Sequence, residues 1–258
     1  MNAQDTARRA IGLLDLTDLN EDCTHEAIDA LCERAVTPHG LVAAICIWPR
    51  FVSHARRQLN EAIPIATVVN FPHGGTDVEI VRVETEQALR DGAAEIDLVL
   101  PYEAFREGDR VAAEGMVRTI REVVPPAPRG TLKVILETGE LADERLVREV
   151  SRLAIGAGAD FIKTSTGKVE TNATPETARI MLEEIAAHAR GGGRRDVGFK
   201  PAGGIRTTAD AAEYLALADR IMGPDWAGPR TFRFGASGVL ADLLATLDGG
   251  TAEVSEGY

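Results

Sequence analysis

The chain has few of the residues that mark several classes of protein. It contains 3 cysteines, at Cys23, Cys32 and Cys46, and none of them forms a Cys-x-x-Cys pair. An odd number of cysteines without paired spacing argues against a disulfide framework. No apolar run approaches the roughly 20 residues that a membrane span needs. We therefore expect neither a disulfide-stabilised protein nor a membrane protein.

Basic residues are also scarce. The chain has 28 Lys and Arg residues against 40 Asp and Glu residues, which gives a formal net charge of −12. Such a balance argues against nucleic acid and anionic membranes as partners, because both carry negative charge. An anionic substrate would need a local cluster of positive groups. The first residues, 1–5, lack the basic and then apolar pattern of a signal peptide, so a cytoplasmic location is predicted.

Short apolar segments recur along the chain, and each is followed by a longer helical pattern. The predicted strands are Ile11–Leu16, Leu41–Trp48, Ile63–Asn70, Ala94–Leu100, Leu132–Glu137, Asp160–Ser165, Val197–Pro201 and Thr231–Gly235. The predicted helices lie near 24–36, 50–61, 76–91, 108–123, 143–157, 175–190, 208–222 and 238–247. Eight such pairs favour a single-domain (β/α)₈ TIM barrel over residues 1–248, with 249–258 as a flexible C-terminal tail. A doubly wound open sheet is the alternative.

Several helices have start signals. Thr174 precedes a proline at the first helical position, and Thr207 has an acidic residue three positions later, as in a capping box. Asp143 and Ser237 are also predicted N-caps.

The segment 158–168 contains a lysine at the end of an apolar strand. Alternation along a strand places Phe161, Lys163 and Ser165 on one face. Desolvation disfavours an ammonium ion, and a free amine is a nucleophile toward carbonyl groups. The alternative is an ordinary strand-end lysine whose amine reaches solvent.

The same alternation sends charged side chains of several strands into the barrel. They are Asp15, Asp97, Lys133, Glu137, Lys163 and Lys200. Thr17 lies on the same strand face as Asp15, and Glu95 lies on the same strand face as Asp97. The alternative is a compensated ion network that only fills the barrel. Barrel interiors are usually packed with branched apolar residues, so this convergence favours an active site. Lys200 would disfavour a second ammonium at Lys163, and Asp97 would keep Lys200 charged and move protons.

Glycine-rich loops follow the last two predicted strands. Gly203 and Gly204 follow the seventh strand, and Gly235 and Ser237 follow the eighth. Loops at these two positions commonly bind phosphate in such barrels, because their backbone N–H groups point at the anion. Arg206 either contacts the phosphate or lies in solvent.

The residues above are similar to a known family. The chain resembles the deoxyribose-phosphate aldolase family, class I (Schiff-base) aldolases with a (β/α)₈ fold, almost from end to end. The segments that carry the resemblance are 14–17, 43–47, 69–74, 95–99, 137–141, 161–168, 198–204 and 234–237, of which the two around Lys163 and Lys200 are the most specific.

The resemblance implies roles for individual residues. Lys163 aligns with the Schiff-base lysine, Asp97 and Lys200 with the proton-relay pair, and Asp15 with a supporting residue. The residues assigned to substrate or phosphate binding are Thr17, Thr166, Lys168, Gly203, Gly204, Arg206, Gly235 and Ser237. For Lys168 a surface role is the alternative. Close relatives can carry serine at Gly238, so one phosphate donor is expected to be lost. The family's C-terminal tyrosine suggests that Tyr258 folds over the site, where it would assist proton transfer.

The implied reaction is the reversible cleavage of 2-deoxy-D-ribose 5-phosphate to D-glyceraldehyde 3-phosphate and acetaldehyde. The expected partners are small phosphosugar and aldehyde substrates, with no metal and no organic cofactor. The alternatives are a phosphosugar isomerase that uses Glu137 as a base, and a non-catalytic phosphosugar-binding barrel. A homodimer is compatible with the sequence, which does not fix the oligomeric state.

Overall fold

The computed structural model describes residues 2–193 and 195–250, and its centre is a barrel of parallel strands. The sheet order is β10-β1-β4-β5-β6-β7-β8-β9, and parallel bridges between Phe199 and Phe232 and between Ala202 and Gly235 join its two ends. The strands are β1 (Leu14–Asp18), β4 (Ala44–Ile47), β5 (Ile65–Val69), β6 (Glu95–Val99), β7 (Thr131–Ile135), β8 (Phe161–Lys163), β9 (Gly198–Lys200) and β10 (Phe234–Ala236). The predicted (β/α)₈ barrel is confirmed, and the open-sheet alternative is wrong.

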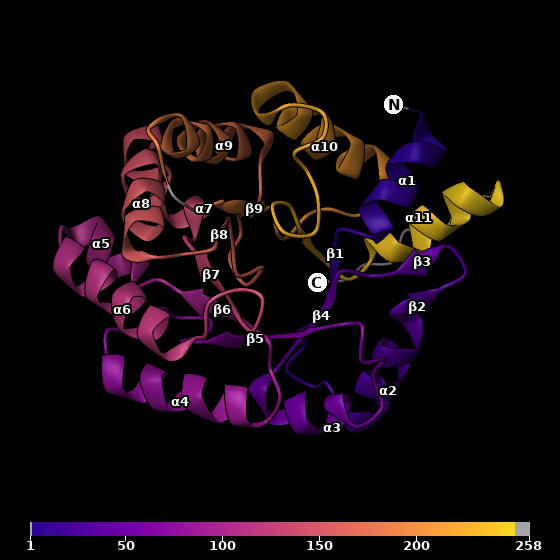
Figure 1. Ribbon diagram of the computed structural model, residues 1–258, viewed down its shortest axis with the longest axis horizontal. Helices are drawn as coiled ribbons and strands as arrows, with labels where there is room; N and C mark the ends of the chain where they lie inside the picture. The colour runs from indigo at the N-terminus through magenta and orange to yellow at the C-terminus, as the bar shows by residue number, and fades with distance from the viewer. Residues whose placement is uncertain (1, 194, 251–258) are drawn as a thin grey trace.

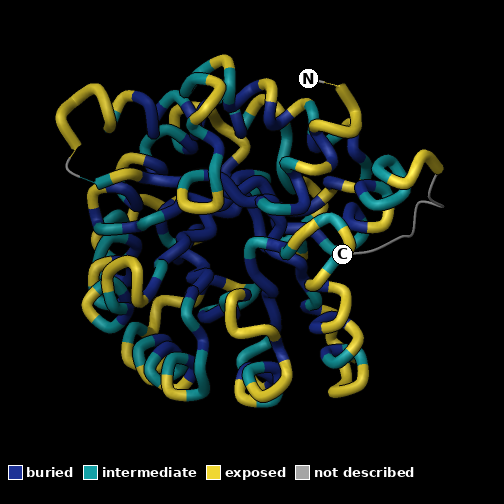
Figure 2. Tube along the Cα trace, turned by 45° about the vertical axis from the view of Figure 1, so that its right-hand side comes forward, coloured by how far each residue is buried: buried dark blue, intermediate teal, exposed yellow. Residues whose placement is uncertain are grey.

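Helices surround this barrel, as Figure 1 shows, and the strands at its centre are buried (Figure 2). The helices between successive strands are α2 (His25–Arg34), α3 (Val52–Arg56), α4 (Val78–Arg90), α6 (Arg110–Val123), α8 (Glu144–Ala157), α9 (Pro175–Arg190) and α10 (Thr208–Met222), and α11 (Val239–Asp248) follows β10. All eight correspond to predicted helices. The second of them, α3, is shorter than predicted: it begins later because a 3₁₀ turn, η1 (Pro49–Phe51), precedes it, and it ends at Arg56.

The capping signals decide where most of these helices begin. Thr174 and Thr207 cap α9 and α10 as part of capping boxes, and the Asp143 side chain accepts hydrogen bonds from the first turn of α8. The prediction for Ser237 was wrong. The N-cap of α11 is Gly238, whose backbone is already helical (φ −76°, ψ −26°), so the helix begins one residue later and without a side-chain cap.

Four further elements were not predicted. α1 (Ala3–Ile11) is capped by Asn2, and its Arg9 pairs with Asp219 of α10 at 2.8 Å. Because α1 includes Ile11, β1 begins at Leu14 rather than at the predicted position. The β2–β3 hairpin (Val36–Thr37 and Gly40–Leu41) likewise takes the start of the second predicted strand. The other two are the short helices α5 (Tyr102–Glu107) and α7 (Thr138–Leu141).

The apolar core has two parts. The larger part lies between the strands and the helices, as it does in every barrel of this kind. The smaller part comprises Leu19, Cys46, Ala66 and Val68, from β4, β5 and the loop after β1, with Trp48 and Phe71 packed against it. The second cluster therefore lines one side of the barrel interior with apolar groups, while the other strands contribute charged ones.

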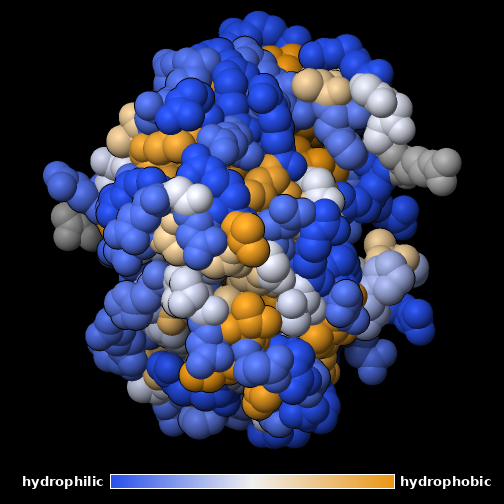
Figure 3. Space-filling model, turned by 90° about the vertical axis from the view of Figure 1, so that its left-hand side faces the viewer, coloured by the Kyte–Doolittle hydropathy of each residue, from blue (hydrophilic) through white to orange (hydrophobic). Residues whose placement is uncertain are grey.

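The outer surface is mostly hydrophilic. Figure 3 shows a face on which hydrophobic areas are scattered among hydrophilic ones. Among the described residues, the large hydrophobic side chains that are exposed are Val36, Ile80, Val83 and Val111. Within the same part of the chain, no helix combines the length and apolar character needed to cross a membrane.

The N-cap of α10 provides a test of the fold. Thr207→Ala removes the hydroxyl that accepts the Asp210 N–H at 3.1 Å, and we expect the free energy of unfolding to fall by about 1 kcal/mol in denaturant titration. Ser53→Ala, at an exposed position inside α3, is the matched control and should leave stability nearly unchanged. Equal stability of the two variants would contradict this account of the cap.

Candidate active site

A network of buried charged side chains occupies the barrel interior. The carboxylate of Asp97 is its centre: Oδ2 lies 3.0 Å from Lys163 Nζ and 2.8 Å from Lys200 Nζ, and Oδ1 lies 2.7 Å from Lys133 Nζ. Asp15 Oδ2 lies 2.5 Å from the same Lys200 amine. Lys163 Nζ and Lys200 Nζ therefore share a single carboxylate oxygen.

The strand register explains this convergence. Lys163 of β8 stands opposite Lys200 of β9, and Asp97 of β6 stands opposite Lys133 of β7. Alternation along each strand turns these side chains inward, where the residues are at most 2% exposed. The interior charges expected from the sequence thus meet, with one exception.

That exception is Glu137, which does not pair with the interior lysines. β7 ends at Ile135, and the backbone of Glu137 is left-handed (φ 52°), which ends the alternation on which the prediction rested. Its carboxylate instead accepts hydrogen bonds from the Thr166 N–H at 3.2 and 3.3 Å. Burial raises the pKa of Glu137, while the bonds from Thr166 and the nearby Lys163 oppose this change.

The charge states of the network follow from its ion pairs. Burial opposes ionisation of Asp97, yet its three lysine neighbours hold its pKa well below the usual range. Burial also opposes the ammonium of Lys200, but the carboxylates of Asp15 and Asp97 raise its pKa. Two carboxylates and the ammonium between them therefore remain charged at neutral pH.

Two residues that were not predicted to be among the converging charges complete the network. Arg233 lies just before β10, with Nη1 2.5 Å from Asp15 Oδ1 and Nη2 2.8 Å from Glu95 Oε1. The other oxygen of Glu95 lies 2.6 Å from Lys133 Nζ. Glu95 was placed on the interior face but not among the converging charges. The alternation of Phe232, Arg233 and Phe234 is the signal that would have identified the arginine.

The loops predicted to bind phosphate lie side by side. Gly203 and Gly204 both have φ of 81°, a left-handed conformation that favours glycine. The Gly203 N–H donates to the Gly235 carbonyl at 3.3 Å, and the Gly235 N–H donates to the Pro201 carbonyl at 2.9 Å. A Cβ on Gly235 would lie 3.1 Å from Lys200 Cε and 2.8 Å from Ala202 Cβ. Gly235 therefore also makes room for the Lys200 side chain.

The remaining candidate residues lie around the mouth of the barrel. Lys168 Nζ donates to the Leu19 carbonyl at 2.8 Å, which links the loops after β8 and β1, and its N–H donates to Thr166 Oγ1 at 3.0 Å. Thr17 is buried, and its hydroxyl donates to the Asp15 carbonyl at 2.7 Å.

Other candidates are less closely tied to the interior. Arg206 is exposed, and its N–H donates to Asp210 at the start of α10. Ser237 is half-buried beside the N-terminus of α11. Tyr258 and the tail residues 251–258 lie outside the described residues.

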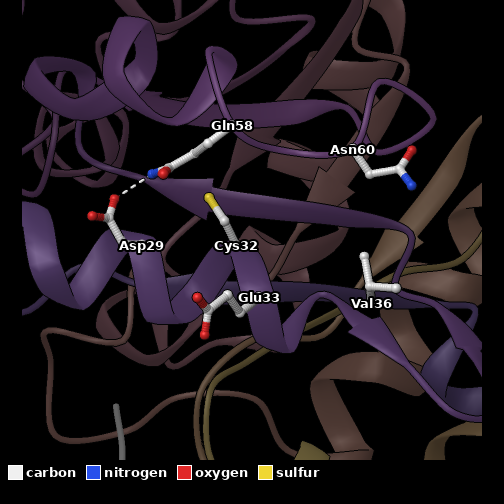
Figure 4. A pocket seen from close by; sticks show the side chains of 6 residues that line it. All are labelled: Asp29, Cys32, Glu33, Val36, Gln58 and Asn60. Atoms are coloured by element: carbon white, nitrogen blue, oxygen red, sulfur yellow. Dashed lines mark hydrogen bonds between the residues drawn. The ribbon is translucent and has the colours of Figure 1, made fainter.

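Two cavities occur elsewhere and do not contain the charged network. The larger, of about 540 Å³, lies beside α2 and the segment after α3 (Figure 4), where Gln58 donates to Asp29. Burial raises the pKa of the Cys32 thiol in its wall to about 11, so this thiol stays protonated at neutral pH. The smaller, of about 210 Å³, lies between the β2–β3 hairpin and α11. Neither brings together groups for the expected chemistry.

No metal-binding cluster accompanies the network in the described part of the chain, where no three His, Cys, Asp or Glu side chains are grouped as ligands. Cys46 lies close enough to the network for its charges to act on the thiol. Burial raises the pKa of Cys46, with the charge of Asp97 adding to the effect, so the thiol is a poor nucleophile there.

Comparison with known proteins agrees with this arrangement. The sequence profile of the DeoC/LacD family aldolases matches residues 9–241. The chain belongs to this family. A curated deoxyribose-phosphate aldolase of Agrobacterium fabrum (strain C58) is 55% identical over 258 residues, which cover 99% of the chain and 97% of the relative.

Solved structures of related proteins have the same fold. A Toxoplasma gondii ME49 protein assigned as a deoxyribose-phosphate aldolase is 27% identical, with a TM-score of 0.84 and 95% of both chains covered. The tetrameric deoxyribose phosphate aldolase of Aeropyrum pernix is 25% identical, with a TM-score of 0.69 over 95% of this chain and 92% of the other. The aldolase family is therefore supported by both sequence and structure.

The contact between Gly235 and Lys200 can be tested directly. In Gly235→Ala the added methyl group overlaps Ala202 and presses on Lys200, so we expect kcat of the aldolase reaction to fall roughly 100-fold and stability to fall by about 1–3 kcal/mol. Gly228→Ala, where nothing lies within 4 Å of the added Cβ, is the control. Wild-type kcat in the Gly235 variant would contradict the proposed need for space at this position.

Proposed function

We propose that this protein is a class I aldolase that reversibly cleaves 2-deoxy-D-ribose 5-phosphate to D-glyceraldehyde 3-phosphate and acetaldehyde. The observation that carries the proposal is the single oxygen of Asp97 that contacts the amines of both Lys163 and Lys200 inside the barrel. Membership of the DeoC/LacD aldolase family and the Agrobacterium relative support the same substrate.

Lys163 is the nucleophile in this proposal. Its free amine adds to the aldehyde carbon of the open-chain sugar, and the resulting carbinolamine loses water to give a protonated imine. The bond between C2 and C3 then breaks as the C3 hydroxyl loses its proton. The bonding electrons move to the imine nitrogen, which leaves an enamine of acetaldehyde and releases the three-carbon aldehyde. Protonation of the enamine and hydrolysis of the imine restore the amine.

Asp97 and Lys200 move the protons. Asp97 Oδ2 lies between the two amines, within hydrogen-bond distance of each, so a proton can pass from one to the other through one oxygen or a bound water. Asp15 places a second carboxylate beside the amine of Lys200. This carboxylate stabilises the Lys200 ammonium and keeps it oriented toward Asp97. The apolar cluster around Cys46 limits the access of water from the opposite side.

The phosphate binds at the loops after β9 and β10. The Gly203 and Gly235 N–H groups already donate to backbone carbonyls, so the Gly204 N–H and the first N–H groups of α11 receive the phosphate, and Ser237 contributes a hydroxyl. Because the chain as a whole carries a net charge of −12, this local site has to supply the attraction for an anionic substrate. Thr166 and Lys168 extend it toward the loop after β8, and Thr17 completes the mouth on the β1 side.

The two alternatives have less support. A phosphosugar isomerase would need a carboxylate base at the reacting carbon, but both oxygens of Glu137 accept the Thr166 N–H. A non-catalytic binding barrel does not require an amine beside a proton-transfer pair. Neither accounts for the family to which the chain belongs.

The assembly and location of the protein stay predictions. We propose a homodimer in the cytoplasm, although the Aeropyrum pernix relative forms a tetramer. Light scattering coupled to size-exclusion chromatography distinguishes these assemblies.

Reductive trapping tests the proposed nucleophile. Borohydride added with 2-deoxy-D-ribose 5-phosphate should attach the substrate or its two-carbon product covalently to Lys163, as peptide mass spectrometry would locate. Lys163→Arg keeps a cation of similar length but has no nucleophilic amine, so it should remain unlabelled and lose turnover. An unlabelled wild-type protein that still converts the sugar would indicate isomerase chemistry instead.

Ser237→Ala tests the phosphate loop. Loss of one hydrogen bond to a charged group should raise KM for 2-deoxy-D-ribose 5-phosphate roughly 10- to 100-fold. The same variant should have the wild-type KM for unphosphorylated 2-deoxy-D-ribose, which serves as the internal control. If KM rises equally for both sugars, the serine does not act on the phosphate.

A further inference from the structure

The interior charges form a closed ring, and Lys163 is not part of it. Its six members alternate in sign, and each contacts the next: Asp97, Lys200, Asp15, Arg233, Glu95, Lys133 and again Asp97. Three carboxylates face three cations, so the ring is neutral when every member is ionised. Among the residues that the structure describes, Asp97 alone joins Lys163 to the ring by an ion pair, at 3.0 Å.

Because Lys163 lies outside the balanced ring, its protonation state is the one that responds to a change in the net charge of the ring. Within the described chain, every residue of the ring contacts at least two groups of opposite sign, whereas the ion-pair partner of the Lys163 amine is Asp97 alone. An ammonium at Lys163 would add one uncompensated positive charge to a buried and otherwise neutral cluster, which low-dielectric surroundings disfavour.

We propose that Glu95 and Arg233 set the charge state of Lys163, because they close a ring that is electrically balanced without it. Neither residue pairs with the Lys163 amine in the described structure, so both are positioning residues that act through the lysines and aspartates that lie between them and Lys163. This inference rests on the proposed function, since it concerns the free amine that attacks the aldehyde.

The other titratable groups near Lys163 do not replace this role. Cys46 on β4 is buried, and its raised pKa keeps the thiol neutral. Glu137 after β7 has a raised pKa, and its carboxylate is engaged by Thr166. Lys133 keeps its charge, because the carboxylates of Asp97, Glu95 and Asp15 raise its pKa despite burial. The ring therefore dominates the electrostatic surroundings of the Lys163 amine.

The sign of each substitution follows. The acid limb of the pH profile is the fall of kcat/KM at low pH, where Lys163 becomes protonated. Glu95→Gln removes a negative charge and leaves the ring positive, which favours the free amine of Lys163, so the acid limb should move to lower pH. Arg233→Gln removes a positive charge and leaves the ring negative, which favours the ammonium, so the limb should move to higher pH. Each shift is expected to be on the order of one pH unit.

The experiment measures kcat/KM for 2-deoxy-D-ribose 5-phosphate against pH for the wild type and both variants. The double variant Glu95→Gln, Arg233→Gln has a neutral ring again and should return the limb to its wild-type position. If one single variant fails to fold, the shift of the other single variant and its reversal in the double variant still test the proposal. A residue that only supports the fold would lower activity at every pH without moving the limb in opposite directions.

A surface ion pair provides the matched control. Arg118 and Glu114 lie one helical turn apart on α6, 2.6 Å from each other, and both side chains are exposed. Arg118→Gln and Glu114→Gln change the net charge by the same amounts and should leave the limb in place, because solvent screens exposed charges.

The outcomes separate this inference from the proposed function. If borohydride traps the substrate on Lys163 of the wild type but the limb is the same in all variants, the role of Glu95 and Arg233 is overturned while the aldolase reaction stands. If both single variants shift the limb in the same direction, the role is also overturned. If the wild-type protein is not trapped at all, the proposed function itself fails.

Discussion

The structure depends on the pairing of buried charges inside the barrel. Four basic and three acidic side chains of the described chain meet there, and each of the seven has a partner within 3.0 Å. Isolated charges are too costly to bury, so the six ionised side chains of the ring are tolerated only because their neighbours have the opposite sign. Removal of one partner leaves an uncompensated charge, and the network therefore acts as a unit.

The closed barrel holds these paired charges in fixed positions, which proton transfer between them requires. Five of the seven side chains come from neighbouring strands β6, β7, β8 and β9, and the other two come from β1 and the residue before β10, where the cylinder closes. The closed sheet fixes the positions of the charges, so little rearrangement is needed when a proton moves. The apolar groups on β4 and β5 leave the opposite wall of the interior uncharged. The loops after β9 and β10, which we propose bind the phosphate, lie next to Lys200, so the proposed anion site adjoins the proposed site of reaction.

Much of this could be predicted from the sequence, because the strands alternate locally. Asp97, Lys163 and Lys200 were placed on interior faces by counting residues along apolar strands, and the N-caps at Thr174 and Thr207 depend on only a few neighbouring residues. The family motifs around the two lysines then assigned the chemistry.

What could not be predicted depends on contacts between distant segments or on single backbone angles. Glu137 is buried but does not join the ion pairs, because its own left-handed backbone ends the alternation of β7. Ile11 was assigned to a strand because the apolar run continues into Leu13 and Leu14, whereas its packing in α1 depends on helices near the other end of the chain. The pairing of Arg233 with Glu95 joins the start of β10 to β6 across the barrel, and this contact depends on the closed sheet, which no local pattern specifies.

Neutron crystallography at neutral pH tests the central claim most directly, because it locates deuterons on individual amines. The balanced ring predicts a neutral Lys163 amine with two deuterons, beside Lys133 and Lys200 with three each. Three deuterons on Lys163 would show that the cluster accepts the additional positive charge, and would contradict the account.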